Sequence, residues 1–178
     1  MSSAIPVELA ESFQPIIGRA VTIRPLRPED ADIELAFLTG LSPQTRHNRL
    51  LGGMIRITRE YIERLTRVDY SRDMALAAVV MMEDREVLIG VARYVLEHEG
   101  RDCEFALVVD DAWQRRSIGR RMMAKLIAVA RDRGLERIYG DVLSTNHHML
   151  DFCRSLGFTL GRNPDDPTVT RATLALRG

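Results

Sequence analysis

The sequence predicts an α/β (α+β) domain with a central mixed, mostly antiparallel sheet of about six to seven strands and helices on both faces. Three observations carry this prediction. Apolar runs after residue 73 are separated by short polar turns, as in antiparallel neighbours, and a later run follows a helical segment, as in a parallel crossover. Several runs are apolar on both faces, which indicates a sheet covered on both sides. Because the linkers are short, we expect one domain over residues 19–178, preceded by an N-terminal arm over residues 1–18.

The first half of the chain reads as one strand followed by three short helices. Apolar and polar residues alternate over 21–24, which predicts an edge-like first strand that two prolines end. Helical segments follow over 28–40, over 42–52 and from Thr58, each with an N-cap residue or a proline in its first turn. The two shorter, polar helices are either a rim that faces a substrate or a solvated surface, and the pattern favours neither.

The second half of the chain alternates strands and helices more regularly. Glycines and polar clusters separate its apolar runs, and the helical segments show apolar residues at helical spacing. The predicted elements are strands over 74–82, 87–96 and 103–109, a helix over 117–133, a strand over 137–142, a helix over 147–155, and a final hairpin over 158–162 and 169–176.

The composition excludes several classes of protein. Lys+Arg and Asp+Glu number 25 each, so the net charge is zero and a nucleic-acid partner is not expected. No apolar run reaches the roughly 18 residues of a membrane span, and no secretion signal opens the chain, so we expect a cytoplasmic protein with reduced cysteines and no membrane partner. We expect no metal, because the adjoining His147 and His148 would point about 100° apart on a helix.

A basic segment follows the predicted 103–109 strand and opens the next helix. Unpaired N–H groups and the positive end of the helix dipole make such a helix start a binding site for an anion. The clustered arginines suit a small polyanion, so we expect a diphosphate to bind here. The segment consists of Gln114, Arg115, Arg116, Ser117, Ile118, Gly119 and Arg120.

This segment and a later one resemble the GNAT superfamily of acetyl-CoA-dependent N-acetyltransferases. The resemblance covers about residues 20–176 and is most specific at 114–119 and at Asn146 through Gly157-Phe158. It implies the GNAT fold, with a parallel strand pair at the acetyl-CoA site, and acetyl-CoA as cosubstrate. It also implies that residues 114–120 hold the pyrophosphate and that the backbone at Leu107, Val108 and Val109 contacts the pantetheine arm, with a local bulge there. Asn146 is either an N-cap, a ligand of the pantetheine, or both.

Two positions depart from the family pattern. Ser117 stands where the phosphate loop of the family has a glycine, and its backbone N–H can serve the same purpose provided that its φ is negative. Cys153 stands where many members have a tyrosine that protonates the leaving thiolate. Either the thiol replaces it, or no side-chain acid is used, or Tyr139 or another group serves.

A narrower resemblance is to the acetyltransferase domain of Pat-type bacterial protein lysine acetyltransferases. It rests on residues 65–75 and 103–109, and it implies that Glu104 is the general base. Apolar neighbours on the strand are expected to desolvate this carboxylate and raise its pKa toward that of a useful base. The alternative is a carboxylate paired with Arg93 on the neighbouring strand.

The sequence therefore predicts an N-acetyltransferase that moves an acetyl group directly from acetyl-CoA to a primary amine in a ternary complex. The acceptor is a protein lysine or a small amine, and a homodimer remains open. The alternative is a catalytically silent acyl-CoA-binding sensor domain, for which the missing tyrosine is the main support.

Overall fold

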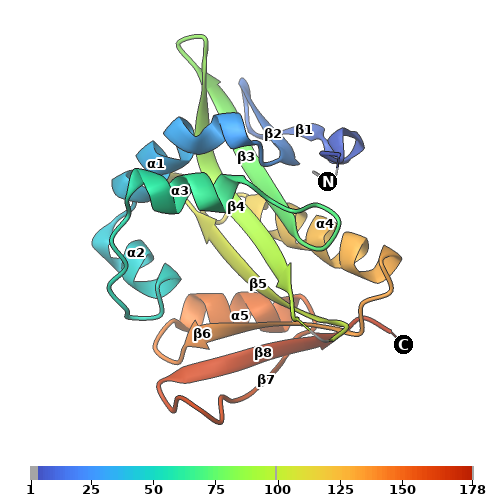
Figure 1. Ribbon diagram of the computed structural model, residues 1–178. Helices are drawn as coiled ribbons and strands as arrows, with labels where there is room; N and C mark the ends of the chain where they lie inside the picture. Colours follow the sequence, from blue (N-terminus) through green and yellow to red (C-terminus); the bar gives the residue numbers. More distant parts are fainter. Residues whose placement is uncertain (1–3, 99, 178) are drawn as a thin grey trace.

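One eight-stranded mixed sheet forms the centre of the molecule, in the order β1-β2-β3-β4-β5-β6-β8-β7 (Figure 1). The computed structural model describes residues 4–98 and 100–177. The strands are β1 (Glu11–Ile16), β2 (Arg19–Pro25), β3 (Met74–Met82), β4 (Arg85–Leu96), β5 (Asp102–Val109), β6 (Arg137–Leu143), β7 (Thr159–Arg162) and β8 (Val169–Ala175). The α-helices are α1 (Ala31–Gly40), α2 (Pro43–Arg49), α3 (Arg59–Thr66), α4 (Ile118–Asp132) and α5 (His147–Ser155), with short 3-10 turns at Val7–Leu9, Pro28–Asp30 and Asp111–Trp113.

The sheet has one strand more than the upper end of the predicted range, because part of the expected N-terminal arm belongs to it. β1 pairs antiparallel with β2, so β1 and not the 21–24 segment is the edge strand. Contacts distant in sequence hold β1 in place: Glu11 accepts a hydrogen bond from Lys125 Nζ on α4 at 3.0 Å, and the Arg121 guanidinium lies 4.3 Å from the centre of the Phe13 ring. Residues 1–3 of the expected arm lie outside the described residues.

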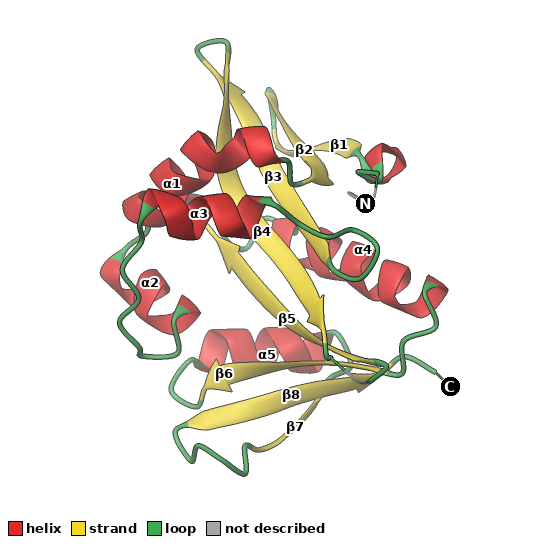
Figure 2. Ribbon diagram, viewed as in Figure 1, coloured by secondary structure: helices red, strands yellow, loops and turns green. Residues whose placement is uncertain are grey.

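Helices cover both faces of the sheet, as predicted. α1 and α3 lie over one face, and α4 and α5 lie behind the other (Figure 2). Alternate residues of β3 serve the two layers: Leu76 packs in the core with α4, whereas Ala77 packs in the core with α1 and α3. Strands that are buried on both faces read as continuous apolar runs, which explains the composition of β3. No helix formed by the described residues is long and apolar enough to cross a bilayer.

The sheet divides at the parallel pair β5–β6. This pairing covers only Asp102–Glu104 against 137–139, whereas β5 stays paired with β4 as far as Val109 and β6 stays paired with β8 as far as Leu143. After Glu104 the two strands diverge (Figure 1). The divergence leaves one edge of β5 without a neighbouring strand in the middle of the sheet, and the candidate site lies there.

Candidate active site

A cavity of about 620 Å³ occupies the gap between β5 and β6. Its walls come from β5, the loop from β5 to α4, the first turn of α4, β6, α2 and α5. The predicted site residues that line it are Glu104, Leu107, Val108, Val109, Gln114, Arg115, Ser117, Gly119, Arg120 and Asn146.

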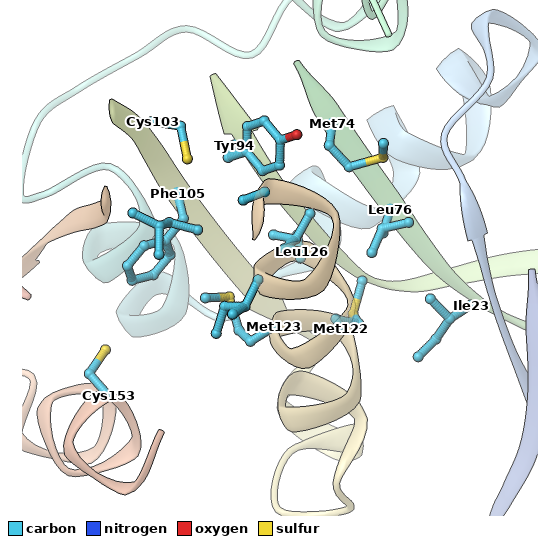
Figure 3. Packing of buried hydrophobic residues seen from close by; sticks show 14 of the residues in the cluster. Ile23, Met74, Leu76, Tyr94, Cys103, Phe105, Met122, Met123, Leu126 and Cys153 are labelled. Atoms are coloured by element: carbon cyan, nitrogen blue, oxygen red, sulfur yellow. The ribbon is translucent and has the colours of Figure 1, made fainter. Parts of the chain in front are cut away.

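Three of the predicted site residues do not line this cavity. Ile118 is 1% exposed and packs in the core beneath α4. Cys153 is also 1% exposed, and Figure 3 shows its thiol on α5 turned toward the same core as Phe105 and Met123. Arg116 is exposed outside the cavity, where its Nε donates a hydrogen bond to the carbonyl of Ala112 at 3.3 Å. Of the three arginines in the segment, Arg115 and Arg120 thus face the cavity.

The backbone of β5 presents hydrogen-bonding groups to the cavity. The Asp110 N–H donates to the Ile89 carbonyl and the Glu97 N–H donates to the Asp102 carbonyl, so the even-numbered residues of β5 bond to β4. The backbone groups of Leu107 and Val109 therefore point away from β4, toward the gap. The Val109 carbonyl already accepts a bond from Gln114 Nε2 at 3.0 Å.

The predicted bulge at Val108–Val109 is wrong. β4 and β5 pair in unbroken register from Gly90–Val109 to Leu96–Cys103, and the register shift in this region lies between β3 and β4 at Ala78/Val79. The backbone of β5 is accessible because β6 diverges from it, and no local distortion is needed. Leu107 and Val109, rather than Val108, carry the backbone groups that face the gap.

The loop before α4 has an unusual backbone conformation. Ser117 has φ +65° and Arg115 has φ +60°, so the expected negative φ at Ser117 is wrong. A non-glycine residue in this left-handed region costs about 1–2 kcal/mol, and glycine is the residue that adopts it most readily. The Ser117 carbonyl accepts the Arg121 N–H at 3.0 Å, which starts the helix and leaves the N–H groups of its first three residues without an intrahelical acceptor.

Glu104 lies on the face of the sheet opposite α4. Side chains alternate along a strand, so Glu104 shares its face with Val108, which packs in the core with α1 and α3. The predicted alternative of a pair with Arg93 is wrong: Arg93 stands opposite Ala106, and its Nη2 donates to Glu34 Oε1 at 3.2 Å. Within residues 4–98 and 100–177 the Glu104 carboxylate forms no hydrogen bond or ion pair.

The surroundings of Glu104 favour its neutral form. Although the residue is exposed to solvent, partial burial raises the pKa of its carboxyl group, and the negative charge of Asp141 raises it further, while Arg171 opposes this. Asp141 is itself neutralised by Arg171, with Nε and Nη2 of that residue 2.9 and 3.0 Å from its two carboxylate oxygens. A free carboxylate with a raised pKa in a cavity is a suitable acceptor for a proton from an amine.

Neither group considered as the acid for the leaving thiolate faces the cavity. Burial raises the pKa of Cys153 to about 11. The Tyr139 hydroxyl donates a hydrogen bond to Glu97 Oε1, and burial together with this bond raises its pKa. His148 is exposed and lines the cavity from α5.

The sequence left α2 open between a substrate-facing rim and a solvated surface, and the structure places it at the rim of the cavity. The helix forms a wall of the cavity, and Asp111 anchors it to the loop after β5: its Oδ1 accepts bonds from Thr45 Oγ1 at 2.6 Å and from Ser42 Oγ at 3.0 Å. The only local signal was that this helix is short, polar and rich in arginine. The α2 residues at the wall are Gln44, Thr45, Asn48 and Arg49.

Comparison with known proteins supports the assignment of a family. The sequence model of the acetyltransferase (GNAT) family matches residues 51–158. Acetyltransferase PA5475 of Pseudomonas aeruginosa is 38% identical over 159 residues, which cover 89% of this chain and 86% of the relative. Acetyltransferase Pat of Mycolicibacterium smegmatis is 32% identical over 142 residues, which cover 79% of this chain but only 41% of Pat.

Solved structures show the same fold. The GNAT domain of S. lividans PAT superposes with a TM-score of 0.84 at 23% identity, over 97% of this chain and 99% of that domain. The cAMP-binding acyltransferase from Mycobacterium smegmatis gives a TM-score of 0.62 at 25% identity, over 95% of this chain and 48% of that protein. With the family model matched over more than half of its residues, this chain belongs to the GNAT acetyltransferase family and is an acyltransferase.

Proposed function

We propose that this protein transfers the acetyl group of acetyl-CoA to a primary amine by direct attack in a ternary complex, with Glu104 as the general base. The observation that carries the proposal is the unpaired Glu104 carboxylate in the cavity wall, with a raised pKa. An ammonium group must lose a proton before its nitrogen can attack a thioester, and a carboxylate with a raised pKa retains that proton better.

The residues around the cavity fit acetyl-CoA as the acyl donor. Free N–H groups at the start of α4, together with Arg115, suit a diphosphate. The strand edge at Leu107 and Val109 suits an extended arm that contains amides. Asn146 caps α5 by accepting the Met149 N–H through Oδ1 at 3.2 Å, which leaves its side-chain N–H₂ free to donate to that arm.

The proposed transfer needs no side-chain acid to protonate the leaving thiolate. Glu104 takes one proton from the ammonium group, the resulting amine nitrogen forms a bond to the thioester carbonyl carbon, the carbon–sulfur bond breaks to release the thiolate, and the nitrogen loses its second proton to solvent. Because Cys153 and Tyr139 lie outside the cavity wall, we propose that the thiolate takes its proton from solvent. Polarisation of the thioester carbonyl by a backbone N–H of β5 would stabilise the developing charge.

The acceptor is a protein lysine or a small primary amine. Support for a lysine comes from the similarity to Pat, of which this chain matches less than half the length. The match leaves more than half of Pat uncovered, so no property of that remaining part is carried over to this chain.

Thiol release from acetyl-CoA in the presence of a panel of amines and lysine peptides tests this function. We expect Glu104→Gln to lower kcat by about a hundredfold or more, while calorimetry finds acetyl-CoA affinity within about twofold of the wild type, since the carboxylate acts on the acceptor. The matched control is Glu60→Gln on an exposed turn of α3, which should leave both quantities unchanged.

The catalytically silent acyl-CoA sensor gives a different result. It would bind acetyl-CoA tightly, yet release no thiol above the background with any amine or peptide of the panel. Full activity of Glu104→Gln would instead retain the transferase and remove Glu104 from the role of base.

A further inference from the structure

Arg49 is placed where it can recognise one part of an acceptor. It is the last residue of α2 and lines the main cavity as well as a small cavity of about 20 Å³ behind it. The side chain is partly buried. In the described part of the chain, its guanidinium forms no hydrogen bond and no ion pair.

The positive charge around Arg49 exceeds the negative charge available to it. Arg46, Arg49 and Arg93 all line the small cavity, and Glu34 is the one carboxylate there. Glu34 Oε1 is already bonded to Arg93, whereas Glu34 Oε2 and the buried Nε atoms of Arg46 and Arg93 have no partner among the described residues. Burial and the neighbouring charge of Arg93 lower the pKa of Arg49. Three guanidinium groups thus act with only two nearby carboxylates, Glu34 and the proposed base Glu104, so one positive charge is left for an anion of a bound molecule.

The missing anion belongs on the acceptor side of the cavity. Val108, on the same face of β5 as Glu104, lines the small cavity together with Arg49. The residues suited to the donor are on the other side: Gly119 opens α4, and a Cβ atom added to it would lie 3.4 Å from Leu107 and 3.8 Å from Val109. Arg49 therefore shares its region of the cavity with the proposed base.

We propose that Arg49 binds a carboxylate of the acceptor, so that the substrate class is a primary amine that carries a carboxylate close to the reacting nitrogen. This inference rests on the proposed function. Glu104 and Arg49 then present opposite charges to the two ends of a zwitterionic group, and the guanidinium fork matches a carboxylate in shape. The same chemistry is available from a free amino acid and from a lysine with an acidic neighbour in a peptide.

Paired acceptors test this inference in the intact protein. The first kind of pair is an ω-amino acid and its amide, for a series of chain lengths. The two compounds of each pair have similar amines, and only one of them carries a carboxylate. The other pair is a lysine peptide flanked by glutamate and the same peptide flanked by glutamine. We expect the wild type to prefer the carboxylate member of at least one pair by about tenfold in kcat/KM, the size of one charge-assisted interaction. The pair that shows the preference identifies the source of the carboxylate.

The variant Arg49→Gln should abolish this preference by raising KM for the carboxylate member, so that kcat/KM for the two members of a pair agrees within about twofold, while acetyl-CoA affinity stays within about twofold of the wild type. Arg49→Lys should retain part of the preference, and it serves as the test if the glutamine variant does not fold. The matched control is Arg64→Gln on the exposed surface of α3, for which no change is expected.

Three outcomes would overturn the inference while leaving the proposed function intact. The first is equal rates for both members of each pair, and the second is a preference that survives in Arg49→Gln. The third is that Arg49→Gln loses transfer from succinyl-CoA but not from acetyl-CoA, which would assign Arg49 to the acyl group. No thiol release with any amine would instead reject the transferase itself.

Discussion

Glu104 carries a carboxylate that forms no hydrogen bond or ion pair with another described residue, and this has a consequence for stability. Its pKa is raised in the folded protein, first by burial and then by Asp141, so the unfolded chain loses the proton at a lower pH. Folding therefore becomes less favourable as pH rises from the ordinary glutamate pKa of about 4.3 to the raised pKa of Glu104 in the folded protein. Above that pKa, the loss of stability is complete and no longer changes with pH.

We expect Glu104→Gln to be more stable relative to the wild type at pH 7 than at about pH 4, because glutamine lacks the charge that burial disfavours. Urea unfolding of both proteins at the two pH values measures the difference. Glu60→Gln, which changes an exposed carboxylate, should show no such dependence. If the difference in free energy of unfolding between the variant and the wild type does not change with pH, the folded protein does not disfavour the ionised carboxylate.

α2 is the element that connects the two halves of the proposed site. Its first turn is bonded through Ser42 and Thr45 to Asp111, which lies just before the phosphate loop, and its last residue is Arg49 at the acceptor side. The bond from Thr45, followed by the bonds from Ser42, lowers the pKa of Asp111, so its charged form holds the helix at neutral pH.

We expect Asp111→Ala to raise KM for the amine acceptor by several-fold, since the charge-assisted bonds that fix α2 contribute about 1.5–3 kcal/mol each before solvent exposure reduces them. Acetyl-CoA affinity should change less, because Asp111 precedes the phosphate loop and supplies no bond to it. Steady-state kinetics and calorimetry measure the two quantities. Asp132→Ala at the exposed end of α4 is the control, and an unchanged KM in Asp111→Ala would show that the anchor is dispensable.

Elements were predictable where local pattern and tertiary environment agree. The strands from β3 onward and α4 were within a few residues of their observed bounds, because apolar runs and glycine stops define them locally. β1 was missed because Pro15 interrupts its alternation and contacts with Lys125 and Arg121 hold it in the sheet. The role of α2 could not be decided from the sequence, because a polar helix facing a cavity has the same composition as one facing solvent.

At the scale of the whole molecule, the sheet consists of two halves that are joined at the parallel pair β5–β6 and share one core. Beyond the short pairing of β5 with β6, the Phe105 ring packs edge-on against Phe158 with ring centres 5.3 Å apart. Gly140 of β6 fits tightly in this junction: a Cβ atom there would lie 2.6 Å from the Phe105 ring.

We expect Gly140→Ala to destabilise the protein by about 1–3 kcal/mol, because the added methyl group forces the Phe105 ring out of its packing. The control is Gly161→Ala on β7, where an added Cβ atom meets nothing within 4 Å. Urea unfolding of both variants measures the difference. Equal free energies of unfolding for the two variants would show that the residues around Gly140 can move to accommodate the methyl group without loss of stability.

The predicted set of donor-site residues was largely placed around the cavity, since the phosphate loop and β5 are continuous in sequence. The exceptions have physical reasons. Cys153 and Ile118 face the core, and which side of a helix is buried at its ends depends on packing that a motif does not encode. The left-handed backbone at Ser117 was also unpredictable, because serine rarely adopts it and the fold imposes it here.

The divergence of β5 from β6 has a consequence for how such a protein can change over generations. In the proposed mode of binding, main-chain groups of β5 and α4 hold the acyl donor, and every residue type except proline supplies such groups, so this side tolerates changes of side chain. In the same proposal, individual side chains such as Arg49 hold the acceptor, so single substitutions there alter recognition. Acceptor specificity can therefore diversify among descendants of this chain while their requirement for the same acyl donor is inherited intact.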